Sequence, residues 1–476
     1  MDCHKRGKKM KKIVIALLLA TVMLLTACQP GVHPVDEQKT APAETTATPP
    51  VSSEPDSITS PEATTEPSDE TSVPVDEVTT EPPTSDTEPS EPVTEPLRVD
   101  MDTFDGDLMN FVETKVDGNY MISPLSFQYA LGMLMAGANG NTLKQFREGL
   151  GIDGNKFDDY IKGFNHFVEG FNSKIEHDAA EYDKLSANDK KYATKPVGVL
   201  RVADSVWKKS DMPDFLLEYG LKLEMYDAKH YSFTLDNVIS EVNKWVNEQT
   251  EGMIPKLLED NYDVSNLALI LMNALYYKNS WLHSFTPTNL VTEFQSKDGA
   301  VKKDFISSCE DYRYYKDDKT ELVIVEMAND VEMVIVIGDC SNLEENIKKA
   351  ERKKVSVAIP KFEIETSLDD KELVEYLMRL GIVDAFGSNA DFSAMFDSAD
   401  ACIHVDDIIQ KTKIKLDETG VEAAVVTAIT MTKGIGTLED PIVFTADRPF
   451  HFFIRTGENQ WGCESGITLF EGAFVK

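Results

Sequence analysis

The stretch Asp417-Glu418-Thr419-Gly420-Val421-Glu422-Ala423-Ala424-Val425-Val426-Thr427-Ala428-Ile429-Thr430 lies near the C-terminal end of the chain and decides the fold. After Gly420, which can act as a hinge, the residues are small or β-branched, with a single charge and no proline. Such a composition favours a β-strand, whose one face would carry Val421, Ala423, Val425, Thr427 and Ile429. Residues 431–437 contain two glycines and no apolar periodicity, so they are predicted to form a loop. The backbone N–H and C=O groups of such a strand still need hydrogen-bond partners from a neighbouring strand in a sheet.

This stretch resembles the hinge of the serpins, a family of inhibitors of serine and of some cysteine proteases. The residues that match the family's hinge are Glu418, Gly420, Val421, Glu422, Ala423, Ala424 and Thr427. The resemblance implies that a protease cleaves an exposed reactive-centre loop, which then inserts as an extra strand into a central sheet. Small residues suit this role because each inward side chain must fit between two existing strands without overpacking the core.

Five further stretches match serpin motifs in the family's order. They are Ser123-Pro124-Leu125-Ser126, Trp245 to Ile254, Asn273 to Trp281, Pro360-Lys361-Phe362 with Leu380 to Ser393, and Phe444 to Phe450. The expected fold is therefore the α+β serpin fold, which has a large central mixed β-sheet, smaller sheets, eight or nine helices and an exposed reactive-centre loop. One serpin domain over residues 99–476 accounts for these matches.

The same motifs assign further site residues by resemblance. Ser123 is predicted to cap a helix that begins at Pro124, and Ser123 and Ser126 would belong to the "shutter" beneath the central sheet. Asn273 and Trp281 come from the family's N-A-x-Y-F-K-G-x-W motif, and Trp281 would lie at the "breach", where insertion starts. Many serpins carry a histidine ten residues before the hinge glycine, where this chain has Gln410. An amide can both donate and accept, so it can take over the hydrogen bonds of the histidine but not its response to pH.

Two local structures are expected from the residues alone. Residues 200–208 are predicted to form a strand, and residues 359–365 are predicted to form a second, alternating strand. As an isolated pattern, the Ser123 region indicates only a capped and buried helix.

The resemblance places the scissile bond at Gly434–Ile435, counted forward from Gly420. A loop that is one residue shorter would place it at Lys433–Gly434, whereas counting back from Pro449 points to a bond near Leu438. The forward count is preferred because the inserted strand must span a sheet of fixed length. Lys433 would suit a trypsin-like protease, and a cut after Gly434, Thr437 or Leu438 would suit elastase-like or subtilisin-like proteases.

Composition excludes several other functions. The formal net charge of −35 and the absence of a basic stripe argue against nucleic-acid binding. The cysteines and histidines form no C-x-x-C, zinc-type or H-E-x-x-H pattern, so neither a metal nor a cofactor is expected. No G-x-S-x-G nucleophile elbow is present, and neither Ser123 nor His404 lies in a catalytic motif, so no enzymatic activity is expected. The pairing of Cys309, Cys340, Cys402 and Cys463 stays open.

Residues 1–28 are predicted to be a targeting segment. A lysine- and arginine-rich start precedes an apolar run, 13–25, and the segment ends in Leu25-Thr26-Ala27-Cys28, which resembles a bacterial lipoprotein signal. By that resemblance Cys28 is lipidated, and the protein is exported and held on the outer face of a bacterial membrane. The alternatives are an uncleaved anchor, for which the apolar run is short, and a plain secretory signal with an extracellular product.

Residues 29–98 are predicted to be a disordered stalk. They hold 14 of the 22 prolines, no aromatic residue, and 16 acidic residues against one lysine before Arg98. Such a segment cannot bury a core. Proline and self-repulsion favour extension, so at about 3.1 Å per residue the stalk could span up to roughly 200 Å.

The predicted function is irreversible, suicide-type inhibition of serine proteases, with cysteine proteases as further candidates, by a monomer that inserts its own cleaved loop. The alternative is a non-inhibitory serpin that acts as a cell-surface binding protein. Such proteins usually have bulky, charged or proline-containing hinges, which the run from Gly420 to Thr427 lacks.

Overall fold

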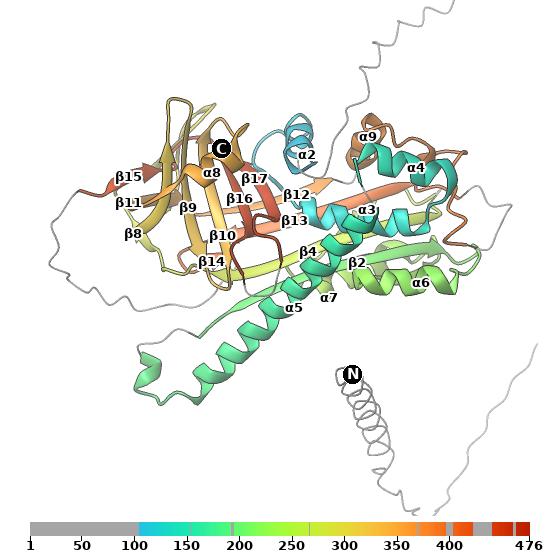
Figure 1. The fold of residues 1–476 in the computed structure, drawn as a ribbon, viewed down its shortest axis with the longest axis horizontal. Helices are drawn as coiled ribbons and strands as arrows, with labels where there is room; N and C mark the ends of the chain where they lie inside the picture. Colours follow the sequence, from blue (N-terminus) through green and yellow to red (C-terminus); the bar gives the residue numbers. More distant parts are fainter. Residues whose placement is uncertain are drawn as a thin grey trace, which may run out of the picture. The chain divides into compact units, whose positions relative to one another are not determined.

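The computed structural model describes residues 104–152, 154–191, 195–265, 267–368, 371–396, 403–421, 440–459 and 463–476 (Figure 1). Eight α-helices lie in these ranges: α2 (Phe104–Glu113), α3 (Pro124–Gly137), α4 (Gly140–Gly149), α5 (Gly154–Lys184), α6 (Leu217–Leu223), α7 (Val238–Gln249), α8 (Leu343–Lys349) and α9 (Glu372–Arg379). Three 3₁₀ turns accompany them: Asp189–Lys191, Glu224–Tyr226 and Asp384–Phe386.

The central sheet has six strands and a mixed topology. In spatial order they are β12 (Phe362–Leu368), β13 (Asp407–Leu416), β14 (Gly420–Val421), β4 (Leu269–Ser280), β2 (Gly198–Lys209) and β3 (Lys229–Phe233). Strands β13 and β4 are parallel, as are β2 and β3, while β4 runs antiparallel to β2. Parallel neighbours need a connection that crosses over the sheet, and the connection from β2 to β3 contains α6.

A second, nine-stranded sheet packs beside the first. Its order is β1 (Tyr120–Ile122), β17 (Thr468–Phe474), β16 (Phe450–Thr456), β10 (Val331–Gly338), β9 (Thr320–Met327), β8 (Phe305–Lys316), β11 (Glu351–Pro360) and β15 (Ile442–Thr445), with β5 (Thr286–Thr288) paired to β8. A separate hairpin consists of β6 (Glu293–Ser296) and β7 (Gly299–Lys302).

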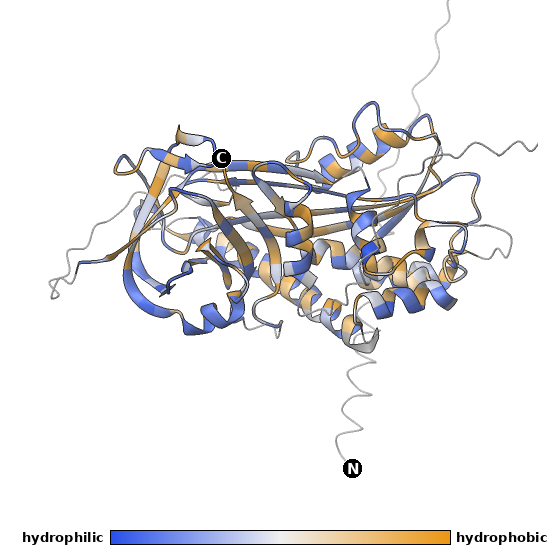
Figure 2. Cartoon of the chain, turned by 90° about the horizontal axis from the view of Figure 1, so that it is seen from above, coloured by the Kyte–Doolittle hydropathy of each residue, from blue (hydrophilic) through white to orange (hydrophobic). Residues whose placement is uncertain are grey.

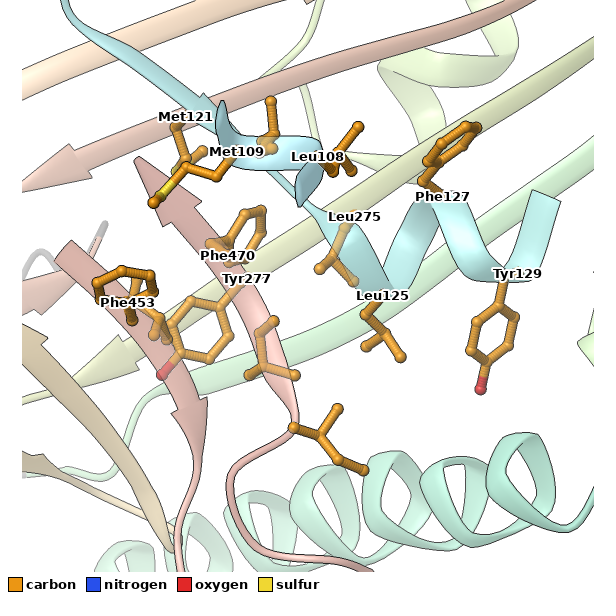
Figure 3. Packing of buried hydrophobic residues seen from close by; sticks show 14 of the residues in the cluster. Leu108, Met109, Met121, Leu125, Phe127, Tyr129, Leu275, Tyr277, Phe453 and Phe470 are labelled. Carbon is orange, nitrogen blue, oxygen red and sulfur yellow. The ribbon is translucent and has the colours of Figure 1, made fainter. Parts of the chain in front are cut away.

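Helix α3 is buried on nearly every side, as its apolar sequence predicts. It contacts β4 of the central sheet and β17 of the second sheet. Figure 3 shows Leu125 of α3 in one cluster with Leu275 and Tyr277 of β4 and with Phe470 of β17. The opposite face of β4 packs on α7, where Trp245 joins Ile270 in a smaller core. Most helices are coloured both hydrophilic and hydrophobic, in keeping with one buried face (Figure 2).

Most of the predicted local structure is confirmed. Helix α3 begins at Pro124, with Ser123 as its N-cap, and β2 contains the predicted strand 200–208. The prediction of one continuous strand over residues 359–365 is wrong. The chain leaves β11 of the second sheet at Pro360 and enters β12 of the central sheet at Phe362. Lys361 lies between the two strands, and the alternating pattern could not reveal this change of sheet.

Replacement of Phe474 with alanine is expected to lower the free energy of unfolding by about 3–5 kcal/mol, because it opens a cavity in the core. The Phe474 ring is buried and contacts the rings of Phe294, Phe362 and Phe450. Urea unfolding would measure the loss. Val443→Ala is the control, since Val443 is 68% exposed and should change stability by less than about 0.5 kcal/mol. Equal effects of the two substitutions would contradict this packing.

Candidate functional site: a gap in the central sheet

The central sheet is incompletely paired between β4 and β13. Strand β4 pairs with β2 from Leu269 to Asn279, and β13 pairs with β12 from Gln410 to Leu416. The two strands pair with each other over only four residues each, from Asp407–Ile270 to Gln410–Asn273. Residues 274–278 of β4 therefore face residues 411–415 of β13 without a ladder between them in the described structure. We call this gap the slot.

Strand β14 lies between β4 and β13 at one end of the slot, and the direct β13–β4 pairing closes the other end. Gly420 pairs with Ser280 and Val421 pairs with Asn279, while Val421 also pairs with Leu416 of β13. The Val421 side chain is 1% exposed and belongs to the main core. Two hinge residues, Gly420 and Val421, thus already belong to the sheet, and β14 ends at Val421 between β4 and β13.

Gly420 occupies a position that only glycine fits. Its φ is +147°, and a Cβ atom there would lie 2.1 Å from the carbonyl oxygen of Asn279. The close approach of β14 to β4 therefore depends on the missing side chain.

The turn before Gly420 is fixed by Trp281 and Lys361. The Trp281 indole N–H donates to the carbonyl of Asp417 at 2.9 Å, and its backbone N–H donates to Thr419 O at 3.0 Å. Lys361 Nζ donates to Glu418 Oε1 at 3.0 Å. Burial opposes the ionisation of Glu418, but a backbone hydrogen bond and Lys361 outweigh it and hold the Glu418 pKa below its ordinary value. The sequence did not indicate this role for Lys361. The role depends on the break between β11 and β12, which only the structure shows.

The closed end of the slot is joined to α3 through Gln410 and Ser123. Gln410 Oε1 accepts from the Ser123 N–H at 3.1 Å, and Gln410 Nε2 donates to the Ser123 carbonyl at 2.9 Å. The Ser123 hydroxyl donates to Leu469 O of β17 at 2.7 Å. The amide at position 410 thus uses both its donor and its acceptor.

Asn273 extends this network on the other side of the slot. It accepts from the Ser126 hydroxyl and from Gln410 Nε2, the latter at 3.4 Å, and its own amide donates to Asp204 Oδ1 of β2. Ser123, Ser126, Asn273 and Gln410 therefore lie together. Asp204 was missed by the sequence reasoning, although it is the one carboxylate in a predicted strand and follows directly after Val202 and Ala203, which was the available signal. Burial raises the Asp204 pKa well above its ordinary value, and the bond from Asn273 opposes that rise only partly.

The remaining predicted site residues lie outside the described residues. They are Glu422, Ala423, Ala424 and Thr427 of the hinge, Lys433, Gly434 and Ile435 at the predicted cleavage point, and Cys28. Cys402 lies outside them as well, while Cys309, Cys340 and Cys463 are free thiols.

Within the described ranges no group of His, Cys, Asp or Glu side chains is arranged to hold a metal ion. Among the helices of those same ranges, none combines the length and the apolar character that crossing a bilayer requires.

The described structure thus combines a central sheet that lacks a ladder between β4 and β13 with a short strand, β14, at one end of that gap. A family model described as Serpin (serine protease inhibitor) matches residues 101–475, and this chain belongs to the serpin family. The leukocyte elastase inhibitor of Sus scrofa is 30% identical over 375 residues, which cover 72% of this chain and 90% of that protein. An uncharacterized serpin-like protein of Methanosarcina acetivorans is 26% identical over 367 residues, covering 72% of this chain and 80% of that protein.

Solved structures agree with this fold. The thermophilic serpin Tengpin in its native state superimposes with a TM-score of 0.61 at 24% identity, covering 77% of this chain and 91% of that one. Serpin48 of the insect Tenebrio molitor gives a TM-score of 0.60 at 22% identity, covering 79% of this chain and 96% of that one. The expected serpin fold is confirmed.

Gly420→Ala is expected to lower the free energy of unfolding by about 1–3 kcal/mol, because alanine rarely adopts this φ and its Cβ would collide with Asn279. Thermal or urea unfolding would measure the loss. Gly163→Ala in α5 is the matched control, since nothing lies within 4 Å of its added Cβ. That change should instead raise stability by about 0.5–1 kcal/mol. If Gly420→Ala were as stable as the unmodified protein, the close approach of β14 to β4 would be ruled out.

Asp407, at the closed end of the slot, is expected to make the protein less stable as the pH rises from 4 to 6. Burial raises the Asp407 pKa to about 6, against the hydrogen bonds that it accepts from Ile408 N and Tyr262 Oη. Between these pH values the unfolded chain releases the Asp407 proton while the folded chain retains it, so folding binds a proton and weakens with rising pH. The loss is about 3 kcal/mol in total for a shift of this size.

Urea unfolding from pH 4 to pH 7 would measure this dependence, with Asp407→Asn as the comparison. The variant cannot ionise at this position, so between pH 4 and pH 7 its stability should fall by about 2 kcal/mol less than that of the unmodified protein. Parallel pH profiles for the two proteins would show that Asp407 does not titrate in this way.

Proposed function

We propose that this serpin is an irreversible suicide-substrate inhibitor of serine endopeptidases, with cysteine endopeptidases as further candidates. The observation that carries the proposal is the slot, which begins where β14 ends and is bordered by two strands of the same sheet. The leukocyte elastase inhibitors among its relatives are named as inhibitors, which supports the same general activity.

The register of β14 specifies how the loop would fill the slot. Since Gly420 pairs with Ser280 and Val421 with Asn279, each later loop residue would meet the preceding residue of β4. Alternation from the buried Val421 then directs Ala423 inward, between Tyr277 and Ile414. Val425 would follow between Leu275 and Thr412. Small side chains fit these positions because the flanking residues are themselves buried.

The opposite face would bring together complementary charges. In the same register Glu422 would lie between Lys278 of β4 and Lys415 of β13. Neither lysine forms an ion pair among the described residues, whereas Lys413 pairs with Glu363 and Glu365 of β12. Opposite charges directly across strands stabilise a sheet by about 0.2–1 kcal/mol per pair. The slot is therefore suited to this particular loop and not only to an arbitrary small-residue strand.

The network at the closed end would be the barrier to insertion. Thr427 is the residue that would reach the Asn273–Gln410 pair, and residues beyond it would have to separate β13 from β4. The Thr427 hydroxyl can donate and accept, so it can take over hydrogen bonds that these amides lose. Insertion would thus replace four direct β13–β4 pairs with pairs to a new central strand on both sides.

In the proposed reaction the protease nucleophile attacks the scissile carbonyl carbon. The new amino terminus leaves, and the loop residue before the cut stays esterified to the enzyme (or thioesterified, for a cysteine enzyme). The preferred bond is Gly434–Ile435, with Lys433–Gly434 as the alternative. Insertion of the freed loop would then drag the protease away and deform its catalytic centre before deacylation.

We also propose that Cys28 is lipidated and that residues 29–98 hold a monomeric inhibitory domain, residues 99–476, away from the outer face of a bacterial membrane. The basis is the sequence alone: the Leu25-Thr26-Ala27-Cys28 box and the acidic, proline-rich composition that follows it. Mass spectrometry of the mature N-terminus would test this, and an unmodified Cys28 would reject the anchor.

Incubation of the protein with trypsin, with an elastase and with subtilisin tests the inhibitory function. A covalent complex that survives a denaturing gel is the expected result with at least one protease, and the mass of the released C-terminal peptide identifies the cleaved bond. Loop cleavage without a complex and without a rise in melting temperature would show that the loop does not insert. The serpin would then be non-inhibitory, and the alternative function as a cell-surface binding protein would be preferred.

The substitution of Ala423 with glutamate is expected to convert the inhibitor into a substrate, because it places a carboxylate between Tyr277 and Ile414 in the core. Ala424→Glu is the matched control. It introduces the same side chain one position later, on the face of Lys413, and should retain inhibition. The ratio of covalent complex to cleaved serpin measures the partition. Equal ratios for the two variants would contradict the proposed register.

A further inference from the structure

A cavity of about 810 Å³ lies between α5 and the edge of β2, separate from the slot. The 3₁₀ turn Glu224–Tyr226 borders it, and residues of α3 and α7 complete its lining through Tyr129 and Trp245. Its volume falls within the range of small-molecule sites in proteins, about 300–1,000 Å³.

Asn172 of α5 is hydrogen-bonded to the edge of β2 that borders the cavity. Strand β3 pairs with β2 only from Ser205 onward, so the preceding residues have no outer neighbour strand in the described structure. Asn172 of α5 takes that place at one position. Its Oδ1 accepts from the Leu200 N–H at 3.0 Å, and its Nδ2 donates to the Leu200 carbonyl at 2.8 Å. This pair of bonds fixes the distance between helix and strand, which preserves the cavity.

Asp204 presents an unsatisfied carboxylate oxygen at this cavity. The residue lines the cavity and is 2% exposed. Its Oδ1 accepts from Asn273, whereas its Oδ2 is buried without a hydrogen-bond partner among the described residues. A buried acceptor without a partner costs about 1–3 kcal/mol, and more if it is charged. A hydrogen-bond donor inside the cavity would remove this cost.

The charges and rings around the cavity indicate the class of that donor. Four other acidic residues line it, Glu169, Glu176, Glu224 and Asp227, against two basic residues, Arg201 and Lys229. The Arg201 guanidinium is already engaged, since it donates to Gln249 O at 2.7 Å and pairs with Glu251. Tyr129, Tyr226 and Trp245 contribute aromatic surface. Acidic residues attract cations, and aromatic rings stabilise cations and flat apolar groups.

We propose that this cavity is a binding site for a small organic cation with an aromatic body, whose ammonium or amidinium group donates to Asp204 Oδ2. The site is independent of loop insertion and does not require that the protein inhibit a protease. It is nevertheless connected to the slot, because the same Asn273 that binds Asp204 also binds Ser126 and Gln410.

Isothermal titration calorimetry of the full chain with tryptamine tests the proposal, and tryptophol is the matched neutral compound. Tryptamine should bind one site per chain with a dissociation constant below about 1 mM, and tryptophol should bind at least tenfold more weakly. Asp204→Asn keeps the size of the side chain but cannot take on the negative charge that would pair with the cation, and it should weaken tryptamine at least tenfold. No binding, or equal binding of the two compounds, would overturn the proposal.

A second variant covers the case in which Asp204→Asn does not fold. Glu169 lies exposed at the cavity, so Glu169→Lys should fold and should weaken tryptamine several-fold by repelling the cation. Asp211→Lys makes the same charge change at an exposed position that does not line the cavity, and it should leave the affinity unchanged. Equal affinities for Glu169→Lys and Asp211→Lys would reject a cation site here.

Discussion

The direct pairing of β13 with β4 over four residues is the constraint on which the rest of the structure depends. It keeps the central sheet together at one end, while β14 separates the same two strands at the other. Between these points each strand is fully paired on its outer side and unpaired toward its neighbour. Under the proposed function, the chain's own loop would supply the strand that this sheet lacks. The energy of the missing ladder is the driving force available to the proposed inhibition, and the four pairs are what delays its release.

The hydrogen-bond network beneath that pairing gives it its rigidity. Ser123 connects β13 to β17 through Gln410 and Leu469, so the central sheet cannot open without disturbing its connection to the second sheet. Side chains in such networks are costly to leave unpaired in a buried environment. Separating β13 from β4 at Gln410 would therefore disturb several of these hydrogen bonds together.

The sequence predicted much of this arrangement because its strongest patterns are local. The cap at Ser123 and the strand at β2 each depend on a few neighbouring residues, and the order of the motifs identified the family. The slot could not be predicted, since it depends on where two strands distant in the sequence stop pairing. Lys361 and Asp204 were missed for the same reason. One acts at a change of sheet, and the other becomes important only because Asn273 and a cavity lie beside it. The predicted cleavage residues lie outside the described residues and stay predictions.

Trp281 has a consequence for how this molecule can be observed. Its indole donates to the carbonyl of Asp417 in the turn before the hinge and lies 5.0 Å, centroid to centroid, from the ring of Phe285. Trp207 and Trp245 instead pack together in the smaller core against α7, away from β14. Tryptophan emission depends on the hydrogen bonding and polarity around the indole. The chain thus carries a natural fluorophore whose hydrogen-bond partner lies in the turn directly before the hinge, and a movement of that turn would change the emission of Trp281 without any attached label.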